Sequence, residues 1–230
     1  MSESAVTRLP SASVEDYLKA IWEVAGADVA STKDVADRLS ISAASVTNMF
    51  ARLQEMGLVR YERYHGSSLT QEGHTKALRL VRRHRLIETF MLKHLGYSWE
   101  EVHEEAEHLE HAVSNGFTER LAEFLGHPSH DPHGAPIPAV DGTLKLDDSH
   151  PLDATKVGEQ VRISQINNRD TSVLTYLGER GLVPGKLLEV KEVRNVDGVV
   201  VVEDENGIPH SLGKPLAISI LVRSTSESGD

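Results

Sequence analysis

Residues 31–59, STKDVADRLSISAASVTNMFARLQEMGLV, have the pattern of two short helices joined by a tight turn. Ser31 or Thr32 is a suitable N-cap for the first helix, because a hydroxyl there can accept a backbone N–H. We expect the second helix over residues 43–56, closed by Gly57. An ordinary helical hairpin would have the same caps, so the residues that follow must distinguish it from a helix-turn-helix.

Residues 58–70, LVRYERYHGSSLT, alternate in polarity around a His-Gly-Ser turn and predict a β-hairpin. Helix, turn, helix and basic hairpin is the order of a winged helix. Short side chains at the start of the second helix let the backbone approach phosphates and bases, Asn can pair with adenine, and Arg suits phosphates. The predicted DNA-binding residues are Ser42, Ala44, Ser45, Thr47, Asn48, Arg52, Arg60 and Arg63.

Two further helices flank this unit. Residues 13–25, SVEDYLKAIWEVA, predict a helix behind a Ser13 cap, with Asp16 at the edge of its apolar stripe. An acidic residue in the first turn of a helix is often simply favourable with the helix dipole. Residues 70–85 predict a long helix whose arginine run we interpret as a solvated face. That run consists of Arg79, Arg82, Arg83 and Arg85.

Residues 84–111, HRLIETFMLKHLGYSWEEVHEEAEHLEH, gather potential metal ligands. If residues 99–125 form one helix, four of them share a face at the edge of the apolar stripe, and an upstream helix adds a pair at i and i+4. The face holds His103, Glu107, Glu110 and His111, and the pair is His84 and Glu88. Because Glu-rich helices are often solvated faces, this stretch alone leaves metal binding open.

The C-terminal part of the chain changes from helical to β pattern. The Pro- and His-rich residues 127–142 cannot continue a helix, and we assign His127, His130 and His133 no ligand role. From Lys156 short strands alternate with turns and predict a small barrel. The expected domains are a winged helix-turn-helix over 1–76, a helical domain over 77–140, a linker over 141–155, an SH3-like β-barrel over 156–224 and a disordered tail over 225–230. The expected fold is therefore mainly α with a small β part.

Composition limits the function classes. The chain has no cysteine, so any metal must be held by nitrogen and oxygen ligands. Its net charge is −11, but residues 42–85 hold eight Lys and Arg against three Asp and Glu, whereas residues 99–153 hold two against thirteen. The basic and acidic segments therefore have separate roles. No apolar run is long enough to span a membrane and no secretion signal is evident, so we expect a cytoplasmic protein.

The sequence resembles the diphtheria toxin repressor family of metal-dependent transcriptional regulators, because several of its segments have counterparts in that family in the same order. They are EDYLKAIWEV, ARLQEMGLV, RRHRLIE, VHEEAEHLEH and DPHGAPIP, and the segments QIN and GLVPG resemble the SH3-like domain of ferrous-iron transport accessory proteins. The resemblance implies a homodimer, with a helical dimerisation domain, that binds double-stranded palindromic operator DNA. It also implies a repressor of metal-homeostasis genes such as those of metal transporters, with no enzymatic activity and no organic cofactor.

The resemblance also implies two metal sites. The primary site corresponds to Asp16, Glu107, Glu110 and His111, and the ancillary site to His84, Glu88, His103 and Asp170. Val173 stands where iron-sensing members have Gln, which leaves the ancillary site one side chain short. Lys19 stands where two-metal manganese sensors have Glu, so we expect no binuclear cluster.

The expected metal is Mn²⁺ or Fe²⁺. Iron-sensing members have Met and Cys at the positions of Asp16 and Glu107, whereas manganese-sensing members have Asp and Glu, as this chain does. Hard oxygen ligands favour these two ions over softer competitors, although geometry and availability must complete the selection.

Two alternatives remain at this stage. One is a winged-helix regulator that senses an organic ligand or a protein partner, with a purely structural acidic helix. The other is a carboxylate-bridged di-metal enzyme, because Glu105 and His108 form a Glu-x-x-His pair. Such an enzyme needs two of these pairs and two more inward-facing Glu residues, and the chain has only one pair.

Overall fold

The computed structural model describes residues 13–145, 147–194 and 196–225. Apart from Thr225, the predicted tail lies outside the described residues. The chain divides into two compact units: the first runs to Val81 and includes Val140–Gly142, and the second holds Arg82–Ala139 and the chain from Thr143 onward. Among the described residues, no helix combines the length and apolarity needed to cross a bilayer.

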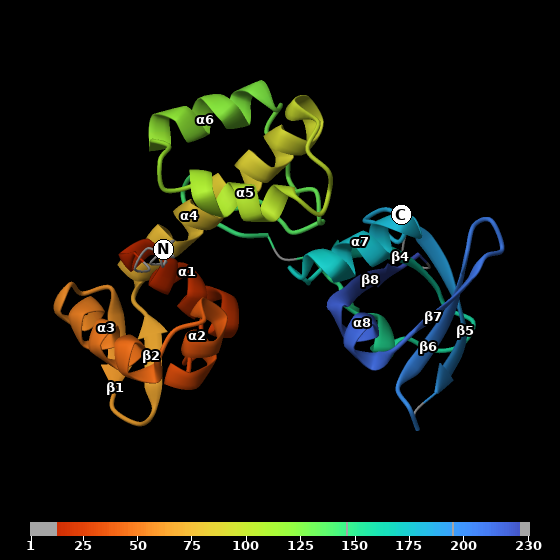
Figure 1. The fold of residues 1–230 in the computed structure, drawn as a ribbon, viewed down its shortest axis with the longest axis horizontal. Helices are drawn as coiled ribbons and strands as arrows, with labels where there is room; N and C mark the ends of the chain where they lie inside the picture. Colours follow the sequence, from red (N-terminus) through yellow and green to blue (C-terminus); the bar gives the residue numbers. More distant parts are fainter. Residues whose placement is uncertain (1–12, 146, 195, 226–230) are drawn as a thin grey trace, which may run out of the picture. The chain divides into compact units, whose positions relative to one another are not determined.

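The first unit is a winged helix-turn-helix, as the sequence predicts (Figure 1). Its three helices are α1 (Val14–Ala25), α2 (Thr32–Leu39) and α3 (Ala43–Glu55). Each begins at a serine whose hydroxyl accepts a backbone N–H of the first turn, so three local caps set the three starts. The helices enclose one apolar core that includes Leu18, Ile21, Val35, Val46, Phe50 and Leu53.

The wing is the antiparallel pair β1 (Val59–Glu62) and β2 (Gly66–Leu69). Its turn consists of residues 63–65, two residues earlier than the predicted His-Gly-Ser turn, because Gly66 already pairs with Glu62. Gly66 has a φ of +115°, and a Cβ there would lie 2.3 Å from the carbonyl oxygen of Ala30. Glycine is therefore required where β2 packs against the loop before α2.

The second unit begins within α4 (Gln71–Phe90), which continues into a π-helical turn, η1 (Met91–Leu95). The expectation of one helix over residues 99–125 is wrong: α5 (Val102–Leu109) and α6 (Asn115–Phe124) are separate. The break follows from a cap, since the Ser114 hydroxyl accepts the N–H of Phe117 and starts a new helix.

The interpretation of the arginine run as a solvated face is also wrong for three of its four members. Arg82 and Arg83 are buried. The Arg82 guanidinium donates to both carboxylate oxygens of Glu119, and that of Arg83 donates to the carbonyl oxygen of Glu110 at 2.7 Å. Arg85 donates to the carbonyl oxygen of Pro136. Buried guanidinium groups need such partners, and here they tie α4 to the segments around it.

The C-terminal part is a six-stranded antiparallel sheet with strand order β3-β8-β4-β5-β6-β7, in keeping with the predicted SH3-like fold. Residues 150–154 were expected in the linker, but His150 and Pro151 pair with β8, and Leu152 belongs to the core of the sheet. Residues 217–219 lie in a helix that ends directly before β8. The elements are β3 (His150–Pro151), η2 (Leu152–Ala154), β4 (Gln160–Ile166), α7 (Thr171–Glu179), β5 (Leu187–Arg194), β6 (Val199–Asp204), β7 (Pro209–Leu212), α8 (Lys214–Ser219) and β8 (Ile220–Ser224).

Replacing Asp204 with asparagine should remove an acid-sensitive part of the stability of this sheet. Its Oδ1 accepts the N–H groups of Asn206 and Ile208 at 2.9 and 3.0 Å, and its Oδ2 lies 3.2 Å from Nζ of Lys186. The hydrogen bond from Ile208 has the largest effect on the pKa of Asp204. With those from Asn206 and Lys186 it outweighs burial and lowers this pKa from 3.8 to about 2.

Because the folded pKa lies below the unfolded one, this stabilisation is present above pH 3.8 and is lost as the pH falls through about 2. The melting temperatures of wild type and Asp204→Asn should therefore differ near neutral pH and converge in strong acid, as followed by thermal melts. The exposed Glu205→Gln is the control, with no comparable convergence. A wild-type advantage that stays constant down to the lowest pH would contradict the assignment.

Candidate metal centre

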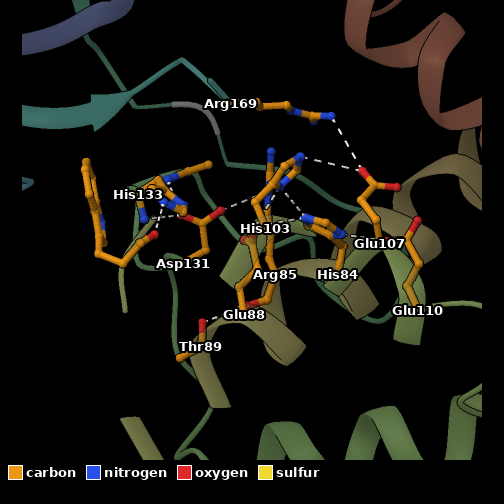
Figure 2. A network of polar contacts seen from close by, with 12 residues as sticks. His84, Arg85, Glu88, Thr89, His103, Glu107, Glu110, Asp131, His133 and Arg169 are labelled. Carbon is orange, nitrogen blue, oxygen red and sulfur yellow. Dashed lines mark hydrogen bonds and ion pairs between the residues drawn. The ribbon is translucent and has the colours of Figure 1, made fainter. Parts of the chain in front are cut away.

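The centre of the second unit is a cluster of three ligand atoms from α4 and α5. His84 and Glu88 lie one turn apart on α4, and His103 lies on α5. The His84 Nε2 is 2.9 Å from Glu88 Oε1 and 2.9 Å from His103 Nδ1, which is itself 3.0 Å from Glu88 Oε1 (Figure 2). His84 and Glu88 are buried, so the three predicted ancillary side chains converge in a desolvated place.

The electrostatics of this cluster favour a cation. Burial alone would raise the pKa of Glu88, but the charge of His84 and hydrogen bonds from His103 and His84 outweigh it and hold that pKa well below its usual range. Glu88 is thus a buried carboxylate anion. A buried anion needs a compensating positive charge, which two imidazoles supply only when protonated.

A second group of ligands shares His84. Its Nδ1 lies 2.5 Å from Oε2 of Glu110, whose side chain is fully buried. The His111 Nε2 is 3.6 Å from Oε1 of Glu110, and Glu107 adds an oxygen within 4.8 Å of ligand atoms of His84 and Glu110. When the neutral His84 ring donates from Nδ1 to Glu110, its Nε2 carries the lone pair that can ligate a cation. One imidazole therefore connects both predicted ligand sets.

The turn before the sheet supplies two residues that the sequence analysis missed. Ligand atoms of Asp131 and His133 lie within 4.8 Å of one another and of Glu88. Burial, followed by the charge of Glu88, raises the pKa of Asp131 to about 6, against the opposing charges of Arg85 and His133. The His133 ring also lies with Nε2 3.0 Å from the carbonyl oxygen of Trp99. Both residues belong to the motif DPHGAPIP, which could have indicated them, but their spacing is not helical and so gave no reason to assign them a ligand role.

The ancillary cluster, together with Asp131 and His133, lines a cavity of about 70 Å³, which has room for a cation with some of its water. Its walls offer imidazole nitrogens and carboxylate oxygens, the ligand types that suit a borderline-to-hard divalent ion. The residues therefore fit a divalent cation by their chemistry and by the space between them. The polar lining residues are His84, Arg85, Glu88, His103, Asp131, His133, Gln165, Asn167, Asn168 and Arg169.

The two remaining predicted ligands, Asp16 and Asp170, each contact a neighbour in the sequence. Asp16 belongs to the first unit, where its carboxylate completes the capping box of α1 by accepting the N–H of Ser13 at 2.6 Å. Asp170 is the N-cap of α7, and its exposed carboxylate accepts from the N–H and the hydroxyl of Ser172. Val173 packs against the core of the sheet. Among the described residues, Asp170 is in none of the ligand groups, so its role remains a prediction.

The predicted DNA-binding side chains share one property: all eight are exposed on the first unit. The Ser42 hydroxyl accepts the N–H of Ser45 and so caps α3, and that of Thr47 donates to the carbonyl oxygen of Ala43. Arg63 lies in the wing turn, with its guanidinium 5.0 Å from the centre of the Tyr64 ring. The start of α3 and the wing are thus open to a large ligand.

The alternative of a di-metal enzyme gains no support from the geometry. Within the described residues, neither Glu105 nor His108 joins a group of three or more ligand atoms. Within the second unit, the side chains that do converge come from α4, from α5 and its C-terminal end, and from the turn of residues 131–134.

Comparison with known proteins covers almost the whole chain. Residues 11–67 match the family described as "Iron dependent repressor, N-terminal DNA binding domain", residues 70–139 that described as "Iron dependent repressor, metal binding and dimerisation domain", and residues 150–224 the FeoA domain. The iron-dependent repressor IdeR of Mycobacterium tuberculosis is 27% identical over 219 residues, which cover 89% of this chain and 95% of IdeR.

Two further relatives are more similar in sequence. The diphtheria toxin repressor of Corynebacterium diphtheriae is 32% identical over 187 residues, 76% of this chain and 83% of that protein. A solved structure of a manganese-dependent transcriptional repressor in complex with manganese is 38% identical with a TM-score of 0.86, covering 92% of this chain and 100% of that one. The chain therefore belongs to the diphtheria toxin repressor family, whose members are metal-dependent, DNA-binding transcriptional regulators and not enzymes.

Proposed function

We propose that the chain is a repressor that uses Mn²⁺, or alternatively Fe²⁺, as its co-repressor and controls genes of metal homeostasis. The observation that supports this best is the convergence of His84, Glu88 and His103 with Glu110 in one buried cluster. Two of the similar proteins are named for iron and manganese respectively, and the ligands here are nitrogen and oxygen only.

The primary ligands in this proposal are Glu107, Glu110 and His111, joined by Asp16. The part of Asp16 rests on the resemblance and on the chemistry of its carboxylate. A bound cation would attract all of these carboxylates to one point. Without it, the carboxylates repel one another, and Oε2 of Glu110 lies 2.5 Å from Nδ1 of His84. Because His111 must be neutral to ligate, acid should weaken binding.

The ancillary ligands are His84, Glu88 and His103, which would hold a second cation. Asp170 remains part of this proposal as a residue from the C-terminal segment. Lys19, which is buried on α1, stands where two-metal manganese sensors have a carboxylate. We therefore propose no binuclear cluster at the primary site. The two sets communicate through His84, which contacts Glu88 with one ring nitrogen and Glu110 with the other.

Asp16 is the residue that ties cation binding to DNA binding. It lies on α1, and α1 shares the core of the first unit with α3, the proposed recognition helix. A cation bound by Asp16 is therefore connected to the recognition helix through this core. Cation and DNA then raise the affinity for each other by the same factor. Ser42 to Asn48 would face bases in the major groove, and Arg52, Arg60 and Arg63 would face phosphates.

The dimer in this proposal is formed by the helical part of the second unit. Phe117 and Phe124 on α6 are 50% and 64% exposed, and Leu95 is 56% exposed. Large apolar side chains left open in this way suit a second copy of the chain. Two copies would place two recognition helices on a palindromic operator. A regulator of this kind acts where the DNA is, so we also propose a cytoplasmic location.

The decisive test uses Asp16→Asn, because an amide oxygen can still accept from Ser13 while the anionic ligand is lost. A duplex enriched from a randomised pool by the wild type with Mn²⁺ serves as the operator probe in fluorescence anisotropy. We expect Mn²⁺ to strengthen wild-type binding strongly and the variant to need about tenfold more Mn²⁺. Asp34→Asn is a matched control, since Asp34 occupies the same cap position on α2. DNA binding that ignores Mn²⁺ in the wild type would overturn the proposal.

A further inference from the structure

Arg169 reaches from the C-terminal part of the second unit to Glu107 on α5. Its Nη1 lies 3.8 Å from Oε1 of Glu107, and the same oxygen lies 3.7 Å from Nε2 of His103 (Figure 2). The Arg169 and Glu107 side chains are 38% and 35% exposed, so both can exchange partners. One carboxylate oxygen therefore faces an arginine from one segment and an imidazole from another.

The backbone that carries Arg169 is held in place on both sides. This loop lies between β4 and α7. The N–H of Ile166 donates to the carbonyl oxygen of His133 at 2.8 Å, and the N–H of Asn167 donates to the carbonyl oxygen of Ser219 at 2.7 Å. The N–H of Asp170 donates to Oδ1 of Asn168 at 2.9 Å. Because the loop is anchored, Arg169 can leave Glu107 by rotating its side chain, with no movement of the sheet.

The other arginines near the centre have different tasks. Arg83 donates to the carbonyl oxygen of Glu110, and Arg85 lies 3.5 Å from Oδ2 of Asp131 and donates to Pro136. Both come from α4. Arg169 differs because it belongs to the C-terminal segment and pairs with a carboxylate that the proposed function uses as a ligand. An oxygen that ligates a cation cannot keep a guanidinium beside it without strong repulsion between the two positive charges.

We propose that Arg169 is an internal competitor for the cation at Glu107. It neutralises Glu107 in the metal-free chain and leaves this carboxylate when Glu107 takes up a divalent ion. This inference rests on the proposed function, which makes Glu107 a ligand, and adds that the C-terminal segment sets the metal concentration at which the protein responds. Metal uptake in turn releases Arg169, so the occupancy of the centre alters the charge that the C-terminal segment presents.

The test measures Mn²⁺ affinity of the full-length protein by isothermal titration calorimetry, without DNA. Arg169→Gln should bind Mn²⁺ about threefold more tightly, since a partly exposed ion pair is worth only a small factor. Arg169→Lys keeps the charge and should stay near the wild type. In a Glu107→Gln background, Arg169→Gln should bring no further gain, because the competitor then has no carboxylate to hold.

Arg180→Gln is the matched control. It removes the same charge from the same segment, at the end of α7, where the guanidinium lies over the Tyr176 ring at 3.7 Å. If Arg180→Gln gained as much Mn²⁺ affinity as Arg169→Gln, the effect would be one of general electrostatics and the inference would be wrong. Unchanged or weaker Mn²⁺ binding by Arg169→Gln would also overturn it. In either case the proposed function stands, provided that the wild type binds Mn²⁺. A wild type that does not bind Mn²⁺ would overturn both.

Salt provides a second measurement on the same variants. The gain of Arg169→Gln over the wild type should shrink toward zero at about 1 M NaCl, where the Debye length is about 3 Å and an exposed ion pair is screened. A gain that is independent of salt would contradict a competition between charges.

Discussion

Replacing Glu110 with glutamine is expected to weaken Mn²⁺ binding by about 100-fold and to abolish the Mn²⁺ dependence of DNA binding. Glu110 is fully buried, and its carboxylate lies 2.5 Å from His84 Nδ1, so it contributes both a ligand oxygen and the acceptor that orients His84. Glutamine keeps the shape but loses the charge, and both functions depend on the charge. Loss of one buried carboxylate therefore affects both ligand sets.

Isothermal titration calorimetry with Mn²⁺ measures the first effect, and fluorescence anisotropy with the enriched duplex measures the second. Glu104→Gln is the control, because Glu104 is an exposed carboxylate on the same helix. Circular dichroism establishes that both variants fold. If Glu110→Gln bound Mn²⁺ as tightly as the control, Glu110 would not be a ligand and the shared role of His84 would have no basis.

Replacing Gly134 with alanine is expected to destabilise the second unit by about 3 kcal/mol, the sum of backbone strain and overpacking. Gly134 has a φ of +85°, and a Cβ there would lie 2.0 Å from the carbonyl oxygen of Ser164 and 2.9 Å from Cα of Gln165. These neighbours are backbone atoms of β4, next to the register shift between Ile163 and Gln165, so they cannot simply turn aside. The turn must separate from β4.

That separation would also disturb the metal centre, because Asp131 and His133 lie on the same turn. Differential scanning calorimetry should show a clear fall in melting temperature for Gly134→Ala. Gly158→Ala is the matched control: its φ is +89°, but no atom lies within 4 Å of the added Cβ, so it should cost only about 1 kcal/mol. Equal shifts for the two variants would mean that the contact with Ser164 is unimportant.

The sequence was sufficient wherever the cause of a structure lies within a few residues. The starts of α1, α2 and α3 follow from serine hydroxyls that accept N–H groups three residues later, and the wing follows from alternation around a turn. The same local spacing predicted the His84 and Glu88 pair on α4. The resemblance then supplied what spacing could not, the grouping of these ligands with residues from other helices.

The sequence was insufficient wherever a distant contact decides the outcome. The arginine run of α4 looks like a solvated face, yet Arg82 and Arg83 are buried because Glu119 and the carbonyl oxygen of Glu110 lie opposite them. Burial of a charged group depends on its partner, and the partner cannot be read from the pattern of one helix.

By itself, the amino-acid sequence determined the winged helix, the helical segment with its nitrogen and oxygen ligands, and the change to a small β domain, because caps, periodicity and turns are local properties. Only the tertiary structure placed Asp131 and His133 beside Glu88, Glu110 beside His84 and Arg169 beside Glu107. These contacts join residues far apart in the chain, and they form where packing of the whole unit compensates for bringing charges out of water.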